Sequence, residues 1–161
     1  MSKSHLRVPK ADHCAFCDYI AGRRPFTILE RSSLCAILVT REQRGVAHCL
    51  VVPIRHVTTI LDLTEEEQCE LMRDVVRIST AIDQVEKRPG LTLWQNNGEP
   101  ASQSIPHVHF HVAATLEEGG TEWGDVTELS IDETDGIAGR LRPALPARGM
   151  AVDTDHEETS Q

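Results

Sequence analysis

The stretch that decides the fold of this chain reads Ser104-Ile105-Pro106-His107-Val108-His109-Phe110-His111-Val112. Its histidines alternate with apolar residues, which is the period of a β-strand, because successive side chains on a strand point to opposite faces. One face of this strand is therefore predicted to hold imidazoles about 7 Å apart, and the other face to pack into a hydrophobic core. Two imidazoles at that spacing can act together on one phosphate-sized group.

A polar loop precedes the histidines. Residues 95–103 read QNNGEPASQ, which combines turn-forming residues with amide and hydroxyl side chains. Such a loop, leading into a strand with imidazoles on one face, predicts one wall of an active site. The spacing alone leaves open a metal site, phosphate-handling catalysis or accidental surface histidines, since neutral imidazole serves both as a metal ligand and in catalysis.

The composition of the 161-residue chain is that of a globular domain, with 40% hydrophobic residues. No apolar run reaches the roughly 18 residues of a membrane-spanning helix, and the polar N-terminus lacks the apolar centre of a secretion signal. Five cysteines, an odd number, do not suggest a disulfide framework. We therefore expect a cytoplasmic protein that does not bind membranes.

The net charge of −9 is unevenly distributed. Residues 1–116 contain 13 acidic and 13 basic residues, whereas residues 117–161 contain 12 acidic and 3 basic residues. The acidic C-terminal part argues against general nucleic-acid binding.

The remaining pattern predicts an α+β domain. Strands are expected at residues 26–30, 34–39, 46–54 and 91–96 and at the histidine stretch. One long helix should begin at the capping box Thr64-Glu65-Glu66-Glu67 and end at the RPG sequence of residues 88–90. Its buried face is indicated by apolar residues at helical spacing, namely Leu71, Val75, Ile78, Ile82 and Val85. The order of elements favours an antiparallel sheet of about five strands with the helix on one face.

We divide the chain into an N-terminal arm (residues 1–13), a main domain (14–125) and an acidic C-terminal extension (126–161). The extension is expected to form a short helix at residues 131–141. A disordered tail should follow from residue 144 onward, because few apolar residues remain there to be buried.

A C-x-x-C pair, Cys14 and Cys17, lies near the N-terminus. Two cysteines at this spacing can share a zinc ion, but a four-coordinate structural site needs two more ligands. Incidental reduced thiols are the alternative, and a redox pair is disfavoured because no βαβ pattern surrounds the cysteines. Sequence separation does not choose among the candidate completing ligands His13, His48, His56 and His107.

Together these motifs resemble the histidine triad (HIT) superfamily, nucleotidyl hydrolases and transferases that share an H-x-H-x-H strand. Five features match in order between about residues 14 and 112. They are CAFC and IAG at residues 14–17 and 20–22, HCLVVP at 48–53 with His56, the long helix, NNG at 96–98, and QS at 103–104 before the histidines. The resemblance implies that the main domain has a HIT-like fold whose antiparallel sheet pairs across a homodimer.

The resemblance also implies a reaction at an α-phosphate. The middle histidine, His109, would attack phosphorus and form a covalent nucleotidyl-histidine that water later cleaves, which suits an imidazole that is neutral at pH 7. His111 matches the histidine that contacts a phosphate oxygen, and Ser104 matches the residue that assists the leaving group. Further positions on the substrate side, or just behind it, are Asn96, Gln103 and His48.

Members of the superfamily with a C-x-x-C resemble the hexose-1-phosphate uridylyltransferases, which hold a structural zinc. Carried over to this chain, the pattern implies the zinc ligands Cys14, Cys17, His56 and His107. The first triad histidine would then be a metal ligand beside the catalytic histidine.

Two features depart from the family pattern. Many relatives have an acidic or amide residue that binds the ribose hydroxyls eight positions before His48, where this chain has Thr40. A threonine cannot accept a bidentate hydrogen bond as a carboxylate does. The segment AATL at residues 113–116 also lacks the usual continuation. Both departures concern nucleoside recognition and leave the phosphorus chemistry intact.

We therefore favour a zinc-stabilised nucleotidyl hydrolase or transferase that cleaves a phosphoanhydride or phosphoramidate bond through His109. The substrate would be a nucleotide or another phosphorylated small molecule. One alternative is a catalytically weak HIT-fold protein that binds nucleotides or a partner and has a regulatory role. The two are distinguished by whether His109→Ala abolishes a turnover that the wild type shows. The other alternative is a HIT enzyme recruited to a non-nucleotide reaction, which Thr40 and the altered segment after His111 suggest.

Overall fold

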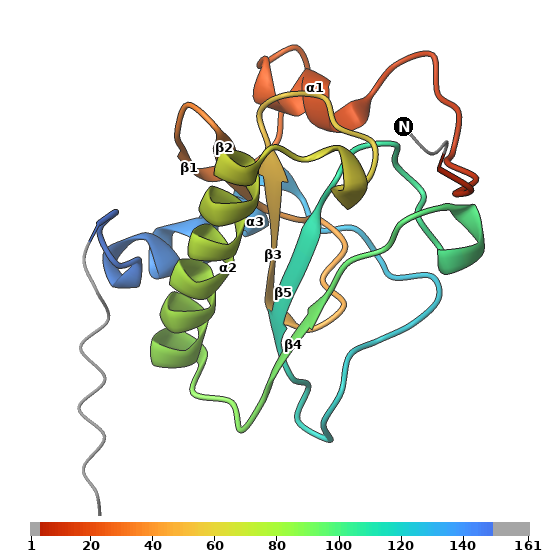
Figure 1. Ribbon diagram of the computed structural model, residues 1–161. Helices are drawn as coiled ribbons and strands as arrows, with labels where there is room; N and C mark the ends of the chain where they lie inside the picture. The colour runs from red at the N-terminus through yellow and green to blue at the C-terminus, as the bar shows by residue number, and fades with distance from the viewer. Residues whose placement is uncertain (1–3, 150–161) are drawn as a thin grey trace, which may run out of the picture.

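The computed structural model describes residues 4–149 of the chain, and a five-stranded antiparallel sheet forms its centre (Figure 1). The strands lie in the order β1-β2-β3-β5-β4, and every neighbouring pair is antiparallel. Their bounds are Ile28–Arg31 (β1), Cys35–Val39 (β2), Val46–Pro53 (β3), Leu91–Trp94 (β4) and Phe110–Ala114 (β5). The predicted α+β class and antiparallel sheet are confirmed.

The long helix α2 (Glu65–Glu86) packs along one face of this sheet. It begins where the sequence predicts, because the Thr64 hydroxyl accepts the Glu67 N–H and the Glu67 carboxylate accepts the Thr64 N–H. It ends at Lys87, which has a left-handed backbone with φ of 50° two residues before a proline. No helix in the described part of the chain is long and apolar enough to cross a bilayer.

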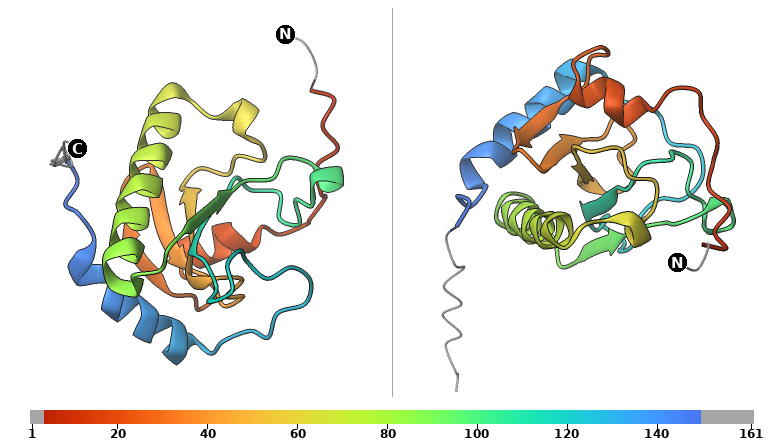
Figure 2. Two further views of the ribbon diagram at one scale, coloured as in Figure 1. Left: turned by 90° about the horizontal axis from the view of Figure 1, so that it is seen from below. Right: turned by 45° about the horizontal axis from the view of Figure 1, so that its top comes forward.

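The acidic extension adds a second helix to the same face. Helix α3 (Ile131–Leu141) is capped by Ser130 and buries Ile137, Ala138 and Leu141 in the core that α2 also lines. It lies over β1 and β2, beside α2 (Figure 2). A single-turn 3-10 helix, η3 (Arg142–Ala144), follows it. This part of the extension therefore belongs to the main hydrophobic core.

The predicted disordered tail was wrong for residues 144–149. Leu145 packs against the core, and Arg148 forms ion pairs of 3.0 Å with Glu30 and 2.9 Å with Asp74. The prediction considered only apolar burial, whereas an ionic network fixes this segment. Residues 150–161 of the predicted tail, and residues 1–3 of the predicted N-terminal arm, lie outside the described residues.

The opposite face of the sheet is partly covered by the short helix α1 (Ala15–Ile20). Phe16 and Ile20 of α1 form a second, smaller core with side chains of β2 and β3, namely Ala36, Leu38, Leu50 and Val52. The sequence predicts a helix on only one face of the sheet, so the position of α1 on the second face differs from that prediction. The part of this face that α1 leaves uncovered is where the histidines lie.

The histidine stretch is a strand only in its second half. The ladder begins at Phe110, and His111 lies opposite Leu50 of β3 and Trp94 of β4. The expectation that all three histidines belong to one strand was therefore wrong. Before the ladder, the N–H of Val108 donates to the carbonyl of Val57 at 2.7 Å, outside the sheet. The N–H of His107 donates to the carbonyl of Ile105 at 2.8 Å, and the carbonyl of His107 lies outside the ladder, where it bonds a side chain.

Candidate active site and metal centre

Four candidate metal ligands converge at the N-terminus of α1. Cys14 and Cys17 face His56, in the connection after β3, and His107, and the ligand atoms all lie within 4.8 Å of one another. Sulfur-to-nitrogen distances are 3.3 Å for Cys14–His107, 3.4 Å for Cys17–His56 and 3.6 Å for Cys17–His107. The corresponding edge of a tetrahedral zinc site is about 3.6 Å, given bond lengths near 2.3 Å to sulfur and 2.0–2.1 Å to nitrogen. The four side chains therefore have the arrangement of such a site.

The ring of His107 is also in the tautomer that a metal requires. Its Nε2 lies 2.9 Å from the carbonyl oxygen of Pro53, and because a carbonyl only accepts, Nε2 holds the hydrogen. Nδ1 then presents its lone pair to the two sulfurs. Burial lowers the pKa of His107 to about 4, which keeps the ring neutral. The cluster thus fits a structural Cys2His2 zinc site, and the other candidates, His13 and His48, lie outside it.

Next to this cluster, His109 is held in the tautomer of a nucleophile. Its Nδ1 lies 2.7 Å from the carbonyl oxygen of His107, so Nδ1 holds the hydrogen and Nε2 holds the lone pair. The ring is 6% exposed, and this burial lowers the pKa of His109 below its ordinary value. Phe16 of α1 packs against it with ring centroids 5.0 Å apart. A neutral imidazole with a free Nε2 is therefore fixed in place.

His111 belongs to a hydrogen-bonded chain that runs behind the site. Its Nδ1 lies 3.0 Å from Nε2 of His48, whose Nδ1 lies 2.9 Å from the carbonyl oxygen of Glu42. The backbone N of Arg44 lies 3.3 Å from the same Nδ1, so these two contacts favour opposite tautomers of His48. Trp94 stacks on His111 with centroids 4.5 Å apart and an interplanar angle of 4°. Burial lowers the pKa of His48 to about 4 and that of His111 to about 2, where the nearby His109 adds to the effect. Both rings are neutral at pH 7.

The polar loop before the histidines places Ser104 and Asn96, but not Gln103, beside His109 and His111. Ser104 is exposed and lines the same hollow as His109 and His111, as does Asn96. Gln103 is 3% exposed; its amide oxygen accepts the N–H of Gly98, and its amide nitrogen donates to the carbonyls of Thr58 and Ile105. It stabilises the loop, and we do not include it among the substrate contacts proposed below.

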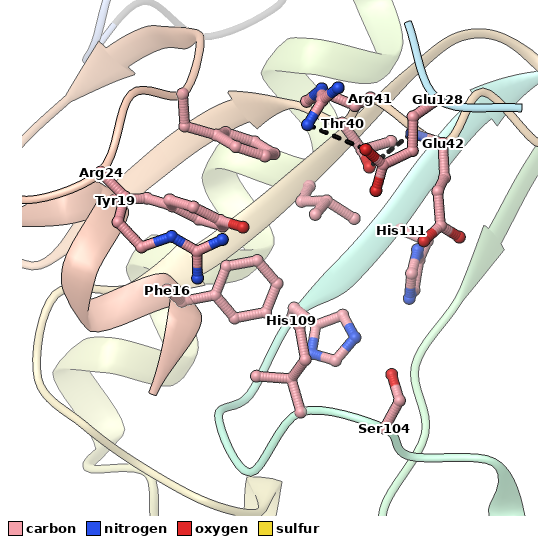
Figure 3. A pocket seen from close by; sticks show the side chains of 13 residues that line it. Phe16, Tyr19, Arg24, Thr40, Arg41, Glu42, Ser104, His109, His111 and Glu128 are labelled. Carbon is pink, nitrogen blue, oxygen red and sulfur yellow. Dashed lines mark hydrogen bonds and ion pairs between the residues drawn. The ribbon is translucent and has the colours of Figure 1, made fainter. Parts of the chain in front are cut away.

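The histidines lie between two hollows that share Ser104, His109 and His111. The first is a cavity of about 260 Å³ with a wall of aromatic side chains (Figure 3). Tyr19 stacks on Phe26 at 4.1 Å, and the guanidinium of Arg24 lies 5.1 Å from the centroid of the Tyr19 ring. The second hollow has a volume of about 390 Å³ and is lined by Trp94, Trp123 and Asn96, among others.

Sequence reasoning missed the residues of the first cavity. Phe16, Tyr19 and Phe26 come from α1 and the segment before β1, where no periodic pattern distinguishes ligand-facing from core residues. The cavity also includes Arg41 and Glu128, which lie far apart in the sequence. An aromatic wall of this kind can pack against the planar group of a bound molecule whose phosphorus lies beside His109.

The chain belongs to the HIT family, because the family model of the HIT domain matches residues 22–118. The adenosine 5′-monophosphoramidase of Schizosaccharomyces pombe is 28% identical over 99 residues, which cover 62% of this chain and 71% of that protein. The asymmetrical bis(5′-nucleosyl)-tetraphosphatase of the same organism is 27% identical over 141 residues, which cover 81% and 77%. Distant relatives within the family are thus nucleotide hydrolases.

Solved structures share the fold. A HIT-like protein from Bartonella henselae matches with a TM-score of 0.77 and 20% identity, over 84% of this chain and 98% of that chain. A zinc-bound histidine triad family protein from Mycobacterium smegmatis matches with a TM-score of 0.66 and 22% identity, over 81% and 91%. The HIT-like fold expected from the sequence is therefore confirmed.

Proposed function

We propose that this protein is a nucleotide hydrolase or nucleotidyltransferase that cleaves a phosphoanhydride or phosphoramidate bond at an α-phosphate. The observation that supports this best is the 2.7 Å hydrogen bond from Nδ1 of His109 to the His107 carbonyl. It directs the lone pair of a buried, neutral imidazole to Nε2, in a ring that lines a cavity with an aromatic wall. The nucleotide hydrolases among the relatives support the same reaction class.

The proposed reaction has two displacements. In the first, Nε2 of His109 attacks the α-phosphorus, a nitrogen–phosphorus bond forms, and the bond to the leaving group breaks. The departing group takes up a proton that comes from solvent, and Ser104 assists by hydrogen-bonding to that group. In the second, water attacks phosphorus, the nitrogen–phosphorus bond breaks, and the proton of the water is released. His111 and Asn96 are proposed to contact the phosphoryl oxygens, where fixed polar groups stabilise the transition state.

The first cavity is proposed to bind the nucleoside. Tyr19 and Phe26 stack on each other and the Arg24 guanidinium lies over the Tyr19 ring, and we propose that a planar base packs against this aromatic wall. The second hollow, lined by Trp94 and Trp123, would then receive the leaving group. In this proposal His109, which lines both hollows, would cut the bond between the α-phosphate and the leaving group.

We further propose that Cys14, Cys17, His56 and His107 hold one structural zinc. All four coordination positions would be occupied by protein ligands, so the ion would supply cross-linking and no reacting group. These ligands join α1, the connection after β3 and the segment before β5. Reduced thiols at these positions are consistent with the cytoplasmic location that we propose.

A homodimer is proposed from exposed apolar side chains of β4 and α2. β4 is an edge strand, and its Leu91 and Leu93 are 36% and 49% exposed. On α2, Met72 and Val76 are 51% and 48% exposed. An unpaired strand edge with exposed leucines favours pairing with a second copy.

The experiment that tests the proposed function is a substrate panel. Wild type, His109→Ala and the control His5→Ala, which removes an exposed histidine of the N-terminal arm, are incubated with adenosine phosphoramidate, dinucleoside polyphosphates and sugar nucleotides. We expect at least one substrate to be turned over by wild type and by His5→Ala, and none by His109→Ala. Turnover that survives His109→Ala, or binding without any turnover by wild type, would contradict the proposal and favour another reaction or a regulatory role.

A further inference from the structure

One rim of the first cavity is formed by the C-terminal extension, outside residues 22–118 that match the HIT domain. The N–H of Leu129 donates to the carbonyl of Arg41 at 2.9 Å, and Nε of Arg41 donates to the carbonyl of Leu129 at 2.6 Å. Glu42 and Glu128 form an isolated antiparallel bridge beside these bonds. The segment around Glu128 is therefore fixed to the loop between β2 and β3.

This attachment places the Glu128 carboxylate in the cavity that contains the reactive histidines. Nη1 of Arg41 lies 2.8 Å from Oε2 of Glu128, and this ion pair orients the carboxylate. Figure 3 shows it on the side of the cavity across from Tyr19, with His109 and His111 in the same hollow. The Glu128 side chain is 53% exposed, so its oxygens remain accessible to a bound molecule.

The charges around the cavity favour a neutral hydrogen-bond donor as the partner of this carboxylate. Arg41 neutralises Glu128, and Arg44 neutralises Glu42 at 2.9 Å. Arg24 adds a further cation, so the cavity has no excess negative charge that would select an amine. A paired carboxylate still has free lone pairs, and two adjacent hydroxyl groups can donate to it together.

We propose that Glu128 accepts hydrogen bonds from the vicinal hydroxyls of a ribose and so selects ribonucleotides. The inference rests on the proposed function in one respect, because it places a sugar between the aromatic wall and the phosphorus at His109. In this role the Glu128 carboxylate also compensates for Thr40, which lines the same cavity and has no carboxylate. The acidic extension thereby acquires a role in specificity, and Glu128 is a specificity-determining residue that takes no part in the bond cleavage.

The test compares the binding of AMP and 2′,3′-dideoxy-AMP to the full chain by calorimetry. The variants are Glu128→Gln and the control Glu122→Gln, which makes the same charge change at an exposed position of the same segment. Wild type and Glu122→Gln should bind AMP about tenfold or more tightly than the dideoxy analogue, since the hydrogen bonds are charge-assisted. In Glu128→Gln this ratio should fall toward one, with the affinity for the dideoxy analogue nearly unchanged.

An unchanged ratio in Glu128→Gln would overturn the inference and leave Glu128 with only its ion pair to Arg41. An equal loss of affinity for both nucleotides would also overturn it, because that result indicates a general effect of charge. A second variant, Glu128→Ala, must reproduce the change in ratio, and thermal unfolding confirms that each variant is folded. Because equilibrium binding needs no turnover, a failed hydrolysis assay would contradict the proposed function while this ratio could still be measured. Absence of AMP binding to wild type would overturn the inference itself.

Discussion

The carbonyl oxygen of His107 accepts a hydrogen bond from Nδ1 of His109 at 2.7 Å, while the ring of His107 faces the two sulfurs of the Cys/His cluster. One residue therefore participates in both sites. Its ring is fixed from the other side by the carbonyl of Pro53. We expect that a disturbance of the Cys/His cluster will reach His109 through this single peptide unit.

Purified protein is predicted to contain one zinc per chain, measured by elemental analysis. Cys17→Ser should remove the zinc and lower the melting temperature, because a metal site that is absent from the unfolded chain couples binding to folding. Cys69→Ser, at an exposed position of α2, is the matched control and should keep the zinc. Zinc-free wild type, or full zinc content in Cys17→Ser, would contradict the assignment.

Ser104→Ala is predicted to affect substrates according to their leaving groups. A poor leaving group needs its proton in the transition state, so its turnover should fall by about a hundredfold, the lower end of general acid catalysis. A good leaving group should be cleaved at nearly the wild-type rate, and it serves as the internal control. Steady-state kinetics with a series of leaving groups of graded pKa provide the measurement. Equal losses across the series would rule out this role of Ser104.

The proposed dimer is tested at the exposed apolar side chains of β4 and α2. Light scattering at micromolar concentration should report twice the chain mass of 17.9 kDa for wild type. Val76→Glu and Leu93→Glu should shift the mass toward one chain, because each places a charge in the proposed apolar contact. A wild-type monomer at this concentration would show that these apolar side chains are not a dimer interface.

A buried ion-pair network is predicted to stabilise the C-terminal part of the fold. Arg77 is 5% exposed and bonds Asp74 at 2.8 Å and Glu30 at 3.1 Å. Arg77→Met should reduce the free energy of unfolding by about 3–5 kcal/mol, since it leaves the buried carboxylate of Asp74 and the partly buried one of Glu30 with fewer partners. Arg73→Met, which removes an exposed ion pair of the same helix, should cost at most about 1 kcal/mol. Denaturant titration measures both, and equal losses would contradict the account.

The same network predicts a dependence on pH. The hydrogen bond from Arg77 holds the pKa of Glu30 below its ordinary value. The resulting stabilisation is present above the pKa that Glu30 has in the unfolded chain, about 4.3. It is lost as the pH falls through the lower pKa that Glu30 has in the folded protein. The stability difference between wild type and Arg77→Met should therefore shrink as the pH is lowered below about 4.

Much of the fold could be predicted from local patterns. The capping box at Thr64 fixed the start of α2, and the helix at residues 131–141 has the predicted bounds. The alternating histidines indicated a strand, but its ladder begins only at Phe110 and includes only the last histidine. Local hydrogen bonding and hydrophobic period decide these features, and both can be recognised in the sequence.

The remaining features depend on contacts that no local pattern encodes. Gln103 donates to the carbonyl of Thr58 in the connection after β3, a contact that follows only from the folded path of the chain. Glu128 enters the cavity because Arg41 and Leu129 pair across a long stretch of sequence. The aromatic wall formed by Tyr19 and Phe26 likewise depends on where α1 docks on the sheet.

The most direct test of the central claim is to trap the covalent intermediate. Wild type is mixed with a substrate labelled at the α-phosphorus, quenched in alkali and digested for peptide mapping. The account predicts label on His109 that survives base, is lost in acid and is absent from His109→Ala, because a phosphoramidate has that stability. Acid-stable label on another residue, or label that persists in His109→Ala, would contradict it.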